Sequence, residues 1–220
     1  MFGYQFYWSI VWSALPQLLA GAWVSLQITV LSLIIGTLIA LPMAVARQGG
    51  SGWGYRVSTA WVELSRNTPV LFQVYMIYFG LGALGINISS YISVLAAISF
   101  NNAGYLAEIF RGGLNAVPRQ QMSGARSLGM TTFQGFIHIV FPQMFKIIFF
   151  AYVTQAIWGM LNTSLGMLVG LKELAGAAQY AQSVSFRTFE FFIVTAAIYY
   201  AMAKAVQLSA QLVFRLMYRS

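Results

Sequence analysis

The segment SGARSLGMTTFQGFIHIVFPQ, residues Ser123–Gln143, is polar in its first half and apolar in its second half. Just before it, Pro118 can begin a short helix, and within it Gly129 can end that helix, because proline suits a first helical turn and glycine suits a left-handed C-cap. Thr131 and Gln134 have the spacing of a capping box for a following helix. The sequence therefore predicts a short capped helix and the start of a second one.

The chain around this segment is too apolar to be a soluble domain. Of its 220 residues, 59% are hydrophobic and 7% are charged, whereas soluble domains are about 25% charged. No charged residue occurs from Met1 to Ala46 or from Asn67 to Ala107, and a helix crosses a bilayer with about 20 apolar residues. The short alternating segments typical of a membrane barrel are missing. An all-α membrane protein is predicted.

Five membrane-spanning helices are expected, with an interfacial helix before them. Residues 1–19 are rich in Trp and Tyr, which favour the headgroup level, so they form a separate N-terminal unit, and residues 20–220 form the transmembrane domain, with a loop over 117–143. The expected spans are Ala20–Ala46, Val70–Ile86, Tyr91–Phe110, Phe136–Trp158 and Phe189–Phe214.

The first of these spans carries a stripe of small residues spaced three or four apart. Small side chains let two helices approach closely, so we interpret the stripe as a packing surface in preference to a solute-lining one. Its members are Gly21, Ser25, Thr29, Ser32, Gly36 and Ala40.

The arginines predict the orientation of the chain in the membrane. Loops on the cytoplasmic side are enriched in Lys and Arg. The first and third loops and the C-terminal tail are basic, whereas the second loop, around Gly82–Ser90, has no Lys or Arg. We therefore expect the N-terminus outside, the C-terminus inside and the 117–143 loop in the cytoplasm. The chain has no cysteine, which excludes disulfides and thiol chemistry.

The 117–143 loop resembles the EAA loop of the permease subunits of bacterial ABC importers. That family pattern reads E-A-A, three residues, G, nine residues, I-x-L-P. The corresponding positions here are Ser123, Gly124, Ala125, Gly129, Ile139, Phe141 and Pro142. The spacing is intact, but serine stands where the family usually has glutamate, and phenylalanine replaces leucine.

Three further segments are similar to motifs of the polar amino acid permeases within that family. They are RNTPVLFQVYMIYFGL (66–81), AGYLAEIFRGGLNAVPRQQ (103–121) and LNTSL (161–165). The resemblance implies a type I ABC importer fold in the bacterial inner membrane, with the loop helix as a coupling helix. It also implies two ATPase subunits that use Mg-ATP, a second permease subunit and an extracytoplasmic solute-binding protein. The missing glutamate at Ser123 favours a heterodimer of permeases over a homodimer.

Polar side chains at membrane depth are the candidates for the solute path. They are Asn101, Asn102, Gln155, Asn162, Thr163 and Ser164. Buried amides and hydroxyls mark either helix–helix hydrogen bonds or a wet cavity. Both readings stay open for Asn101, Asn102 and Gln155, whereas the small residues beside Gly166 favour a cavity for the other three. This set contains no carboxylate, so the preferred solute is glutamate, glutamine or aspartate over a cationic amino acid.

The remaining charged side chains are expected to have structural roles. Glu108 and Arg111 are three residues apart, which suits an ion pair on one helical face, and Glu63 with Arg66 is similar. His138 has no other metal-ligand residue near it in the sequence, so no metal site and no bound cofactor are expected.

The sequence argues against catalysis by this chain. It contains no nucleotide-binding loop and no hydrolase motif, so ATP hydrolysis is assigned to separate subunits. The alternative is a self-sufficient channel or an ion-coupled carrier, which would need an ionisable relay within its spans. A membrane scaffold without a transport role would leave the loop pattern unexplained.

Overall fold

The computed structural model describes residues 4–218, and every regular element among them is helical. The α-helices are α1 (Trp8–Gln48), α2 (Trp53–Asn67), α3 (Val70–Tyr75), α4 (Leu81–Ala83), α5 (Ser90–Ala116), α6 (Arg119–Ser127), α7 (Thr132–Gly135), α8 (Phe141–Asn162), α9 (Leu174–Ser185) and α10 (Thr188–Met217). A π-helical turn, Met76–Gly80, joins α3 to α4, and another, Phe136–Val140, joins α7 to α8. A 3₁₀ segment, Thr163–Val169, continues α8.

Among the described residues, three helical segments are long and apolar enough to cross a membrane: α1, Thr132–Val169 and α10. The apolar helix Val70–Ala83 is shorter. Helix α5 has 27 residues, which is sufficient length, but it is not among the segments that are apolar enough. The all-α fold is confirmed, whereas the number of five spans stays a prediction.

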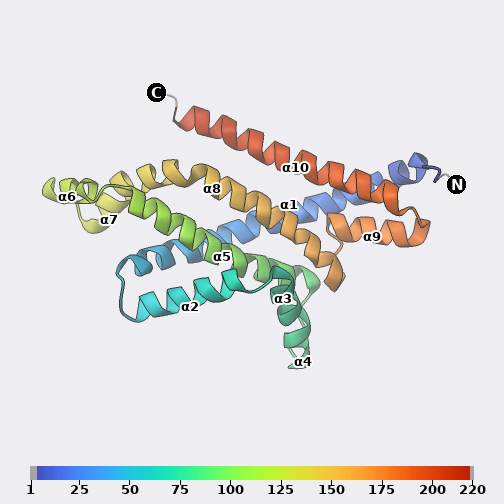
Figure 1. Cartoon of the computed structure of the whole chain (residues 1–220), viewed down its shortest axis with the longest axis horizontal. Helices are drawn as coiled ribbons and strands as arrows, with labels where there is room; N and C mark the ends of the chain where they lie inside the picture. Colours follow the sequence, from blue (N-terminus) through green and yellow to red (C-terminus); the bar gives the residue numbers. More distant parts are fainter. Residues whose placement is uncertain (1–3, 219–220) are drawn as a thin grey trace.

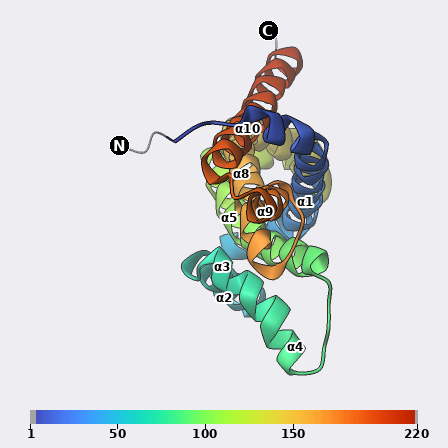
Figure 2. The ribbon, with the colours of Figure 1, turned by 90° about the vertical axis from the view of Figure 1, so that its right-hand side faces the viewer.

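The separate interfacial helix expected over residues 1–19 differs from the structure. Residues 1–3 lie outside the described part, and one continuous helix, α1, runs through the expected boundary at residue 19. Pro16 lies inside α1, and an interior proline removes one helical hydrogen bond and bends a helix without necessarily ending it. Figure 2 shows the first turns of α1 crossing the end of the bundle beside α10.

Helix α5 is the central element of the bundle. It packs against α1, α2, α3 and α8, and Figure 1 shows it running through the middle of the molecule. About half of its residues are buried, including Asn101 and Asn102. A helix surrounded by other helices needs less apolar surface than one facing lipid, which explains why α5 is the more polar of the long helices.

The two ends of the bundle differ. Figure 1 places α6, α7 and the C-terminus at one end, and α9 and the N-terminus at the other. The arm formed by α3 and α4 stands away from the other helices in Figure 2. Its side chains Phe72, Met76 and Phe79 are exposed in this chain.

The stripe of small residues on α1 is a packing surface, as the sequence predicted. All six members are buried. A Cβ atom on Gly21 would lie 2.8 Å from the backbone of Glu173, and one on Gly36 would lie 3.0 Å from Asn102 Cβ. Helix α1 therefore contacts the start of α9 and the middle of α5 at glycine positions that leave no space for a larger residue.

Two adjacent glycines of α5 provide a test of this close packing. A Cβ on Gly113 would overlap Ile148 and lie 2.8 Å from Met144 Cγ on α8, whereas a Cβ on Gly112 would meet nothing within 4 Å. We expect Gly113→Ala to destabilise the fold by about 1–3 kcal/mol through overpacking. Gly112→Ala should be neutral or stabilise by about 0.5–1 kcal/mol through helix propensity. The thermal unfolding midpoints of the two purified variants would test this, and equal midpoints would contradict the packing.

Candidate functional site

A cavity of about 600 Å³ lies between α3, α5 and α8. Its volume is within the range of about 300–1,000 Å³ that small-molecule sites occupy. Three of the six predicted solute-path residues line it. The full lining is Val70, Asn101, Tyr105, Ile109, Ala151, Thr154, Gln155, Trp158 and Asn162.

The three amide side chains of this cavity have unused hydrogen-bonding capacity. Asn101 Nδ2 donates to the carbonyl oxygen of Ser65 over 2.9 Å, which leaves Asn101 Oδ1 without a described donor. Gln155 Nε2 donates to Asn102 Oδ1 over 2.9 Å, and Gln155 Oε1 likewise accepts no hydrogen bond from a described residue. The Asn162 side chain makes no hydrogen bond with a described residue. The cavity therefore offers two carbonyl oxygens and one complete carboxamide.

Asn102, for which both readings stayed open, does not line this cavity. Its side chain is 1% exposed, and both ends of its amide bond neighbouring helices. Nδ2 donates to Ser32 Oγ on α1 over 3.2 Å, and Oδ1 accepts the bond from Gln155 on α8. The polar stripe of α1 is thus connected through α5 to α8. For Asn102 the structure answers the open alternative in favour of helix–helix bonding, because burial requires both of its polar ends to be paired.

Thr163 and Ser164 also lie outside the lining. Thr163 Oγ1 donates to the Met160 carbonyl and Ser164 Oγ to the Leu161 carbonyl, each over 2.7 Å. The helix does not open here; it tightens into a 3₁₀ segment that ends at Gly170, whose φ is 76°. Hydroxyls three residues after a carbonyl can bond it locally, so these two side chains are used within their own helix.

Sequence reasoning missed Glu173, which is fully buried between the 3₁₀ segment and α9. Its carboxylate accepts hydrogen bonds from Ser25 on α1 (3.2 Å), from Tyr199 on α10 (2.8 Å) and from the backbone N–H of Gly176 (2.7 Å) and Ala175 (3.0 Å). Burial raises the pKa of the Glu173 carboxyl. A charged pair, Lys172-Glu173, between apolar segments is the only local signal of this site.

A second carboxylate, Glu108 of α5, is shared by arginines from three helices. It accepts a hydrogen bond from Arg47 of α1, Arg111 Nη2 lies 2.8 Å from Oε2, and Arg66 Nη1 of α2 lies 3.9 Å from the same oxygen. The expected Glu108–Arg111 pair is present. The expected Glu63–Arg66 pair is absent from the described ion pairs, because the packing of α2 on α5 directs Arg66 to Glu108 instead.

The loop over 117–143 has the predicted local structure. Helix α6 begins directly after Pro118, and its last residue, Ser127, is followed by Leu128 and then by Gly129 in the left-handed conformation with a φ of 82°. The capping box is complete: Gln134 N–H donates to Thr131 Oγ1 over 3.2 Å, and Thr131 N–H donates to Gln134 Oε1 over 2.8 Å.

The other motif positions of the loop differ in exposure. Ser123 and Gly124 are exposed on α6, whereas Ala125 is 4% exposed and faces Gly135 at the start of the next helix. Pro142 lies within the continuous segment Thr132–Val169, at the second residue of α8, one residue after the π-helical turn ends at Val140. Proline cannot donate to a carbonyl one turn back, and wider π turns accompany such local defects in a helix.

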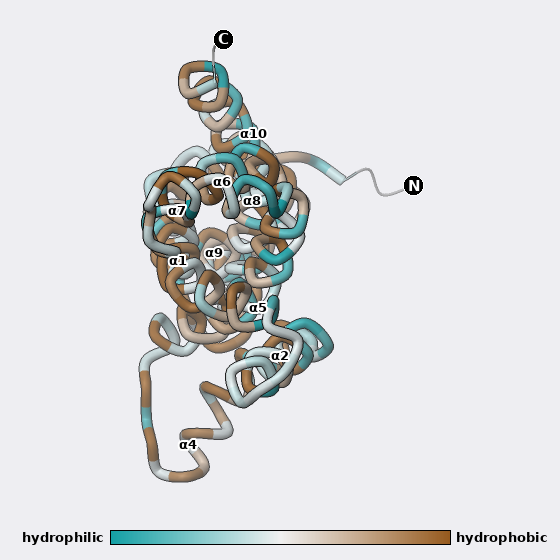
Figure 3. Tube along the Cα trace, turned by 90° about the vertical axis from the view of Figure 1, so that its left-hand side faces the viewer, coloured by the Kyte–Doolittle hydropathy of each residue, from teal (hydrophilic) through white to brown (hydrophobic). Residues whose placement is uncertain are grey.

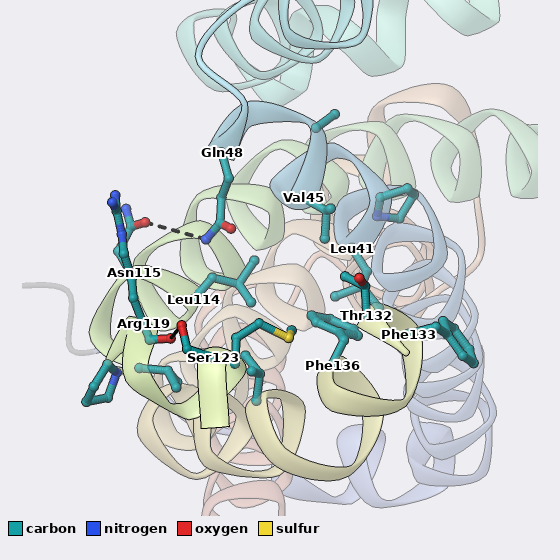
Figure 4. A pocket seen from close by; sticks show the side chains of 16 residues that line it. Leu41, Val45, Gln48, Leu114, Asn115, Arg119, Ser123, Thr132, Phe133 and Phe136 are labelled. Carbon is teal, nitrogen blue, oxygen red and sulfur yellow. Dashed lines mark hydrogen bonds between the residues drawn. The ribbon is translucent and has the colours of Figure 1, made fainter. Parts of the chain in front are cut away.

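A second cavity, of about 1560 Å³, lies behind α6. Figure 4 shows its walls: the end of α1 with Leu41, Val45 and Gln48, the end of α5 with Leu114 and Asn115, and the loop helices. Its lining is mainly apolar, with a 3.5 Å bond from Gln48 Nε2 to Asn115 Oδ1 at one side. Beside this cavity, α6 is held by Met122, which packs against the core cluster that includes Val117 and Val140, and by Ala125, which is buried against Gly135.

This chain has close similarity to transport proteins over most of its length. The octopine transport system permease protein OccM of Rhizobium radiobacter is 33% identical over 200 residues, which cover 87% of this chain and 82% of OccM. The glutamine transport system permease protein GlnP of Escherichia coli (strain K12) is 29% identical over 197 residues, 89% of this chain and 90% of GlnP.

Solved structures show the same architecture. The crystal structure of an amino acid ABC transporter with histidines contains a chain that is 31% identical, with a TM-score of 0.86, covering 96% of this chain and 99% of that one. The MetNI methionine ABC transporter in an inward facing conformation has a TM-score of 0.76 at 19% identity, which concerns the fold alone.

The family model described as "Binding-protein-dependent transport system inner membrane component" matches residues 32–218. The match includes α5, the 117–143 loop and every residue that lines the 600 Å³ cavity. On this evidence, the chain belongs to the family of inner membrane components of binding-protein-dependent transport systems.

Proposed function

We propose that this chain is the permease subunit of an ATP-driven importer for a polar amino acid. A solute-binding protein delivers the solute outside, and two separate ATPase subunits use Mg-ATP in the cytoplasm. The permease itself binds no nucleotide. The observation that carries the proposal is the 600 Å³ cavity, in a member of this family, lined by three amide side chains that have unused hydrogen-bonding capacity. The glutamine and octopine permeases among its relatives support an amino acid as solute.

The cavity chemistry suits a zwitterion. Carbonyl oxygens such as Asn101 Oδ1 and Gln155 Oε1 accept hydrogen bonds from an ammonium group, and the Asn162 amide can donate to a carboxylate. No acidic residue lines the cavity, so a cationic side chain would be desolvated there without a counter-charge. The lining has no basic residue either, so glutamine suits it best, and glutamate or aspartate is retained as a proposed solute with its counter-charge supplied by the partner permease. We retain Thr163 and Ser164 in the path as the helix end beside Asn162, and Asn102 as the residue that orients Gln155.

The mechanical part of the proposal is the 117–143 loop, with α6 as the coupling helix seated on an ATPase subunit. Only Val117 and Pro118 separate α6 from α5, so a shift of α6 moves the helix that forms one wall of the cavity. Motif residues Ser123, Gly124, Ala125, Gly129 and Pro142 shape this connection. A second permease subunit completes the membrane core, and the serine at position 123, where the family usually has glutamate, supports a partner of different sequence.

The rival function, an ion-coupled carrier, has one observation in its favour, because Glu173 is a buried carboxylate. It lies at the start of α9, away from the cavity lining, and four donors from α1, α9 and α10 already bind it. A carboxylate that is saturated with hydrogen bonds at a helix N-terminus is better explained by the attachment of α9 to the bundle.

Transport by the reconstituted complex tests the proposal and the cavity together. Uptake of labelled glutamine or glutamate into vesicles should require both the ATPase subunits and internal ATP. Asn162→Ala removes an amide without breaking an internal bond, so uptake at solute concentrations below saturation should fall about tenfold, the equivalent of about 1.4 kcal/mol for a lost hydrogen bond to a charged group. Thr154→Val is the matched control, because the Thr154 hydroxyl is already bonded to Phe150. Uptake driven by a proton gradient without ATPase subunits would refute the importer.

We propose from the arginine distribution that the N-terminus lies outside and the C-terminus inside; Figure 1 shows the termini at opposite ends, which fits either orientation. Leu84 and Leu128 are 76% and 81% exposed, so single cysteines at these positions of the cysteine-free chain are accessible. With the N-terminus outside, an impermeant thiol reagent should label Leu84→Cys from outside intact cells and Leu128→Cys only after the membrane is opened. Labelling of both from one side would show that the topology is wrong.

Gly129 tests whether the end of α6 matters for coupling. A Cβ at Gly129 would meet nothing within 4 Å, so the cost of a substitution comes from its φ of 82° alone. Valine resists this conformation by about 1–2 kcal/mol, whereas asparagine tolerates it. We expect Gly129→Val to abolish most stimulation of ATPase activity by the loaded binding protein, with Gly129→Asn close to wild type. Equal activity of both variants at matched expression would contradict the role of this turn.

A further inference from the structure

The exposed surface of α6 and of the turn after it is positively charged. We define the coupling face as the exposed residues Arg119, Ser123, Arg126, Leu128 and Phe133. Helix α6 lies at the tip of the bundle in Figure 1, and Figure 3 views the molecule from that end. The face is therefore available to a cytoplasmic partner in this chain.

The two arginines of this face have no acidic partner among the described residues. No Asp or Glu occurs between Glu108 and Glu173 in the sequence, and none of the described salt bridges includes Arg119 or Arg126. Arg126 Nη1 makes only long hydrogen bonds, of 3.4 Å to the Met130 carbonyl and 3.5 Å to Thr132 Oγ1. The coupling face thus carries two uncompensated positive charges.

Two large apolar side chains accompany these charges. Leu128 is 81% exposed and Phe133 is 73% exposed, and they lie on either side of Gly129. The left-handed glycine and the capping box fix the backbone between them. An exposed aromatic side chain next to arginines on a rigid turn is typical of the centre of a protein interface.

We propose that the coupling face binds an ATPase groove whose rim is acidic and whose floor is apolar. Carboxylates on the rim would pair with Arg119 and Arg126, and the floor would receive Leu128 and Phe133. This inference rests on the proposed function and names the chemistry of its partner. The family pattern has a glutamate at this position, whereas here Ser123 stands between two arginines. A groove with a basic rim would repel this face.

Charge reversal in the assembled complex tests the proposal. The complex is held in nanodiscs of phosphatidylcholine, and the ATPase subunit that co-purifies with the wild-type chain is titrated onto Arg119→Glu and Arg126→Glu. Each variant should bind at least about tenfold more weakly, as close interfacial charge pairs do when one member is lost, and the affinity should depend less on salt. Arg56→Glu is the matched control: it makes the same charge change at an exposed arginine outside the coupling face.

Ser123→Glu distinguishes an acidic ATPase rim, which would bind the arginines, from a basic rim, which would bind a glutamate. A glutamate at this position is four residues after Arg119 and three before Arg126, so it would pair with both within α6. We expect weaker ATPase binding, by several fold, although the change restores the residue usual in the family. Tighter binding by Ser123→Glu, or unchanged binding by both arginine variants, would overturn the acidic groove while leaving the importer intact.

Two further outcomes are decisive. If the arginine variants lose affinity only in nanodiscs that contain phosphatidylglycerol, the arginines bind anionic headgroups and the proposed groove is wrong. If the wild-type chain retains no ATPase subunit under any condition, the proposed function fails before the groove is tested. Leu128→Ser in the phosphatidylcholine nanodiscs should also weaken binding, since it removes one apolar contact and no charge.

Discussion

The hydrogen-bonding needs of polar groups on α5 determine how the helices of this chain are arranged. In a bilayer a buried amide or carboxylate without a partner costs several kcal/mol, so each one selects its neighbours. Asn101 bonds α2, and Asn102 bonds α1 and α8. Glu108 collects arginines from α1, α2 and α5 itself. Removal of Asn102 would leave Gln155 on α8 without its partner, and removal of Glu108 would leave Arg47 on α1 without its counter-charge.

The same helix connects the parts to which we assign function. Asn101, Tyr105 and Ile109 of α5 line the 600 Å³ cavity, and the Arg66 guanidinium lies 5.2 Å above the Tyr105 ring. Glu108 lies between the cavity-lining residues Tyr105 and Ile109, and only Val117 and Pro118 separate the end of α5 from α6. The cavity wall, the charged cluster and the exposed loop helix are therefore successive turns of one rigid connection. An ordered series of packed elements of this kind is what a mechanical coupling requires.

Local signals made the loop predictable, whereas distant partners did not. The helix start after Pro118, the turn at Gly129 and the Thr131–Gln134 capping box each depend on residues at most a few positions apart, and all three are present. Ser25 and Glu173, in contrast, are 148 residues apart, and Arg47 and Glu108 are 61 apart. No spacing rule connects such pairs, so the burial of Glu173 and the assignment of Arg66 to Glu108 depended on the packing of whole helices.

The cavity residues, too, were predictable only in part from the sequence. Composition and position identified the polar residues near membrane depth, but only the rotation of each helix decides which of them face a cavity. Adjacent residues Asn101 and Asn102 point about 100° apart on α5, so one lines the cavity and the other bonds α1 and α8. At the end of α8, Asn162 lines the cavity while Thr163 turns back to its own helix. Because the sequence does not give the rotation of each helix, the same role was predicted for both residues of each adjacent pair.

The chain has a net charge of +8 and only four acidic residues, and the positions of these four decide which basic residues are neutralised. Three of them are used inside the chain: Glu108 by arginines, Glu173 by α1, α9 and α10, and Glu190 by Tyr4, Tyr7 and Arg187 near the N-terminus. The arginines of α6 receive none of this compensation. The positive charge from which we predict the orientation in the membrane is thus also exposed on α6, where we propose that the soluble partner binds.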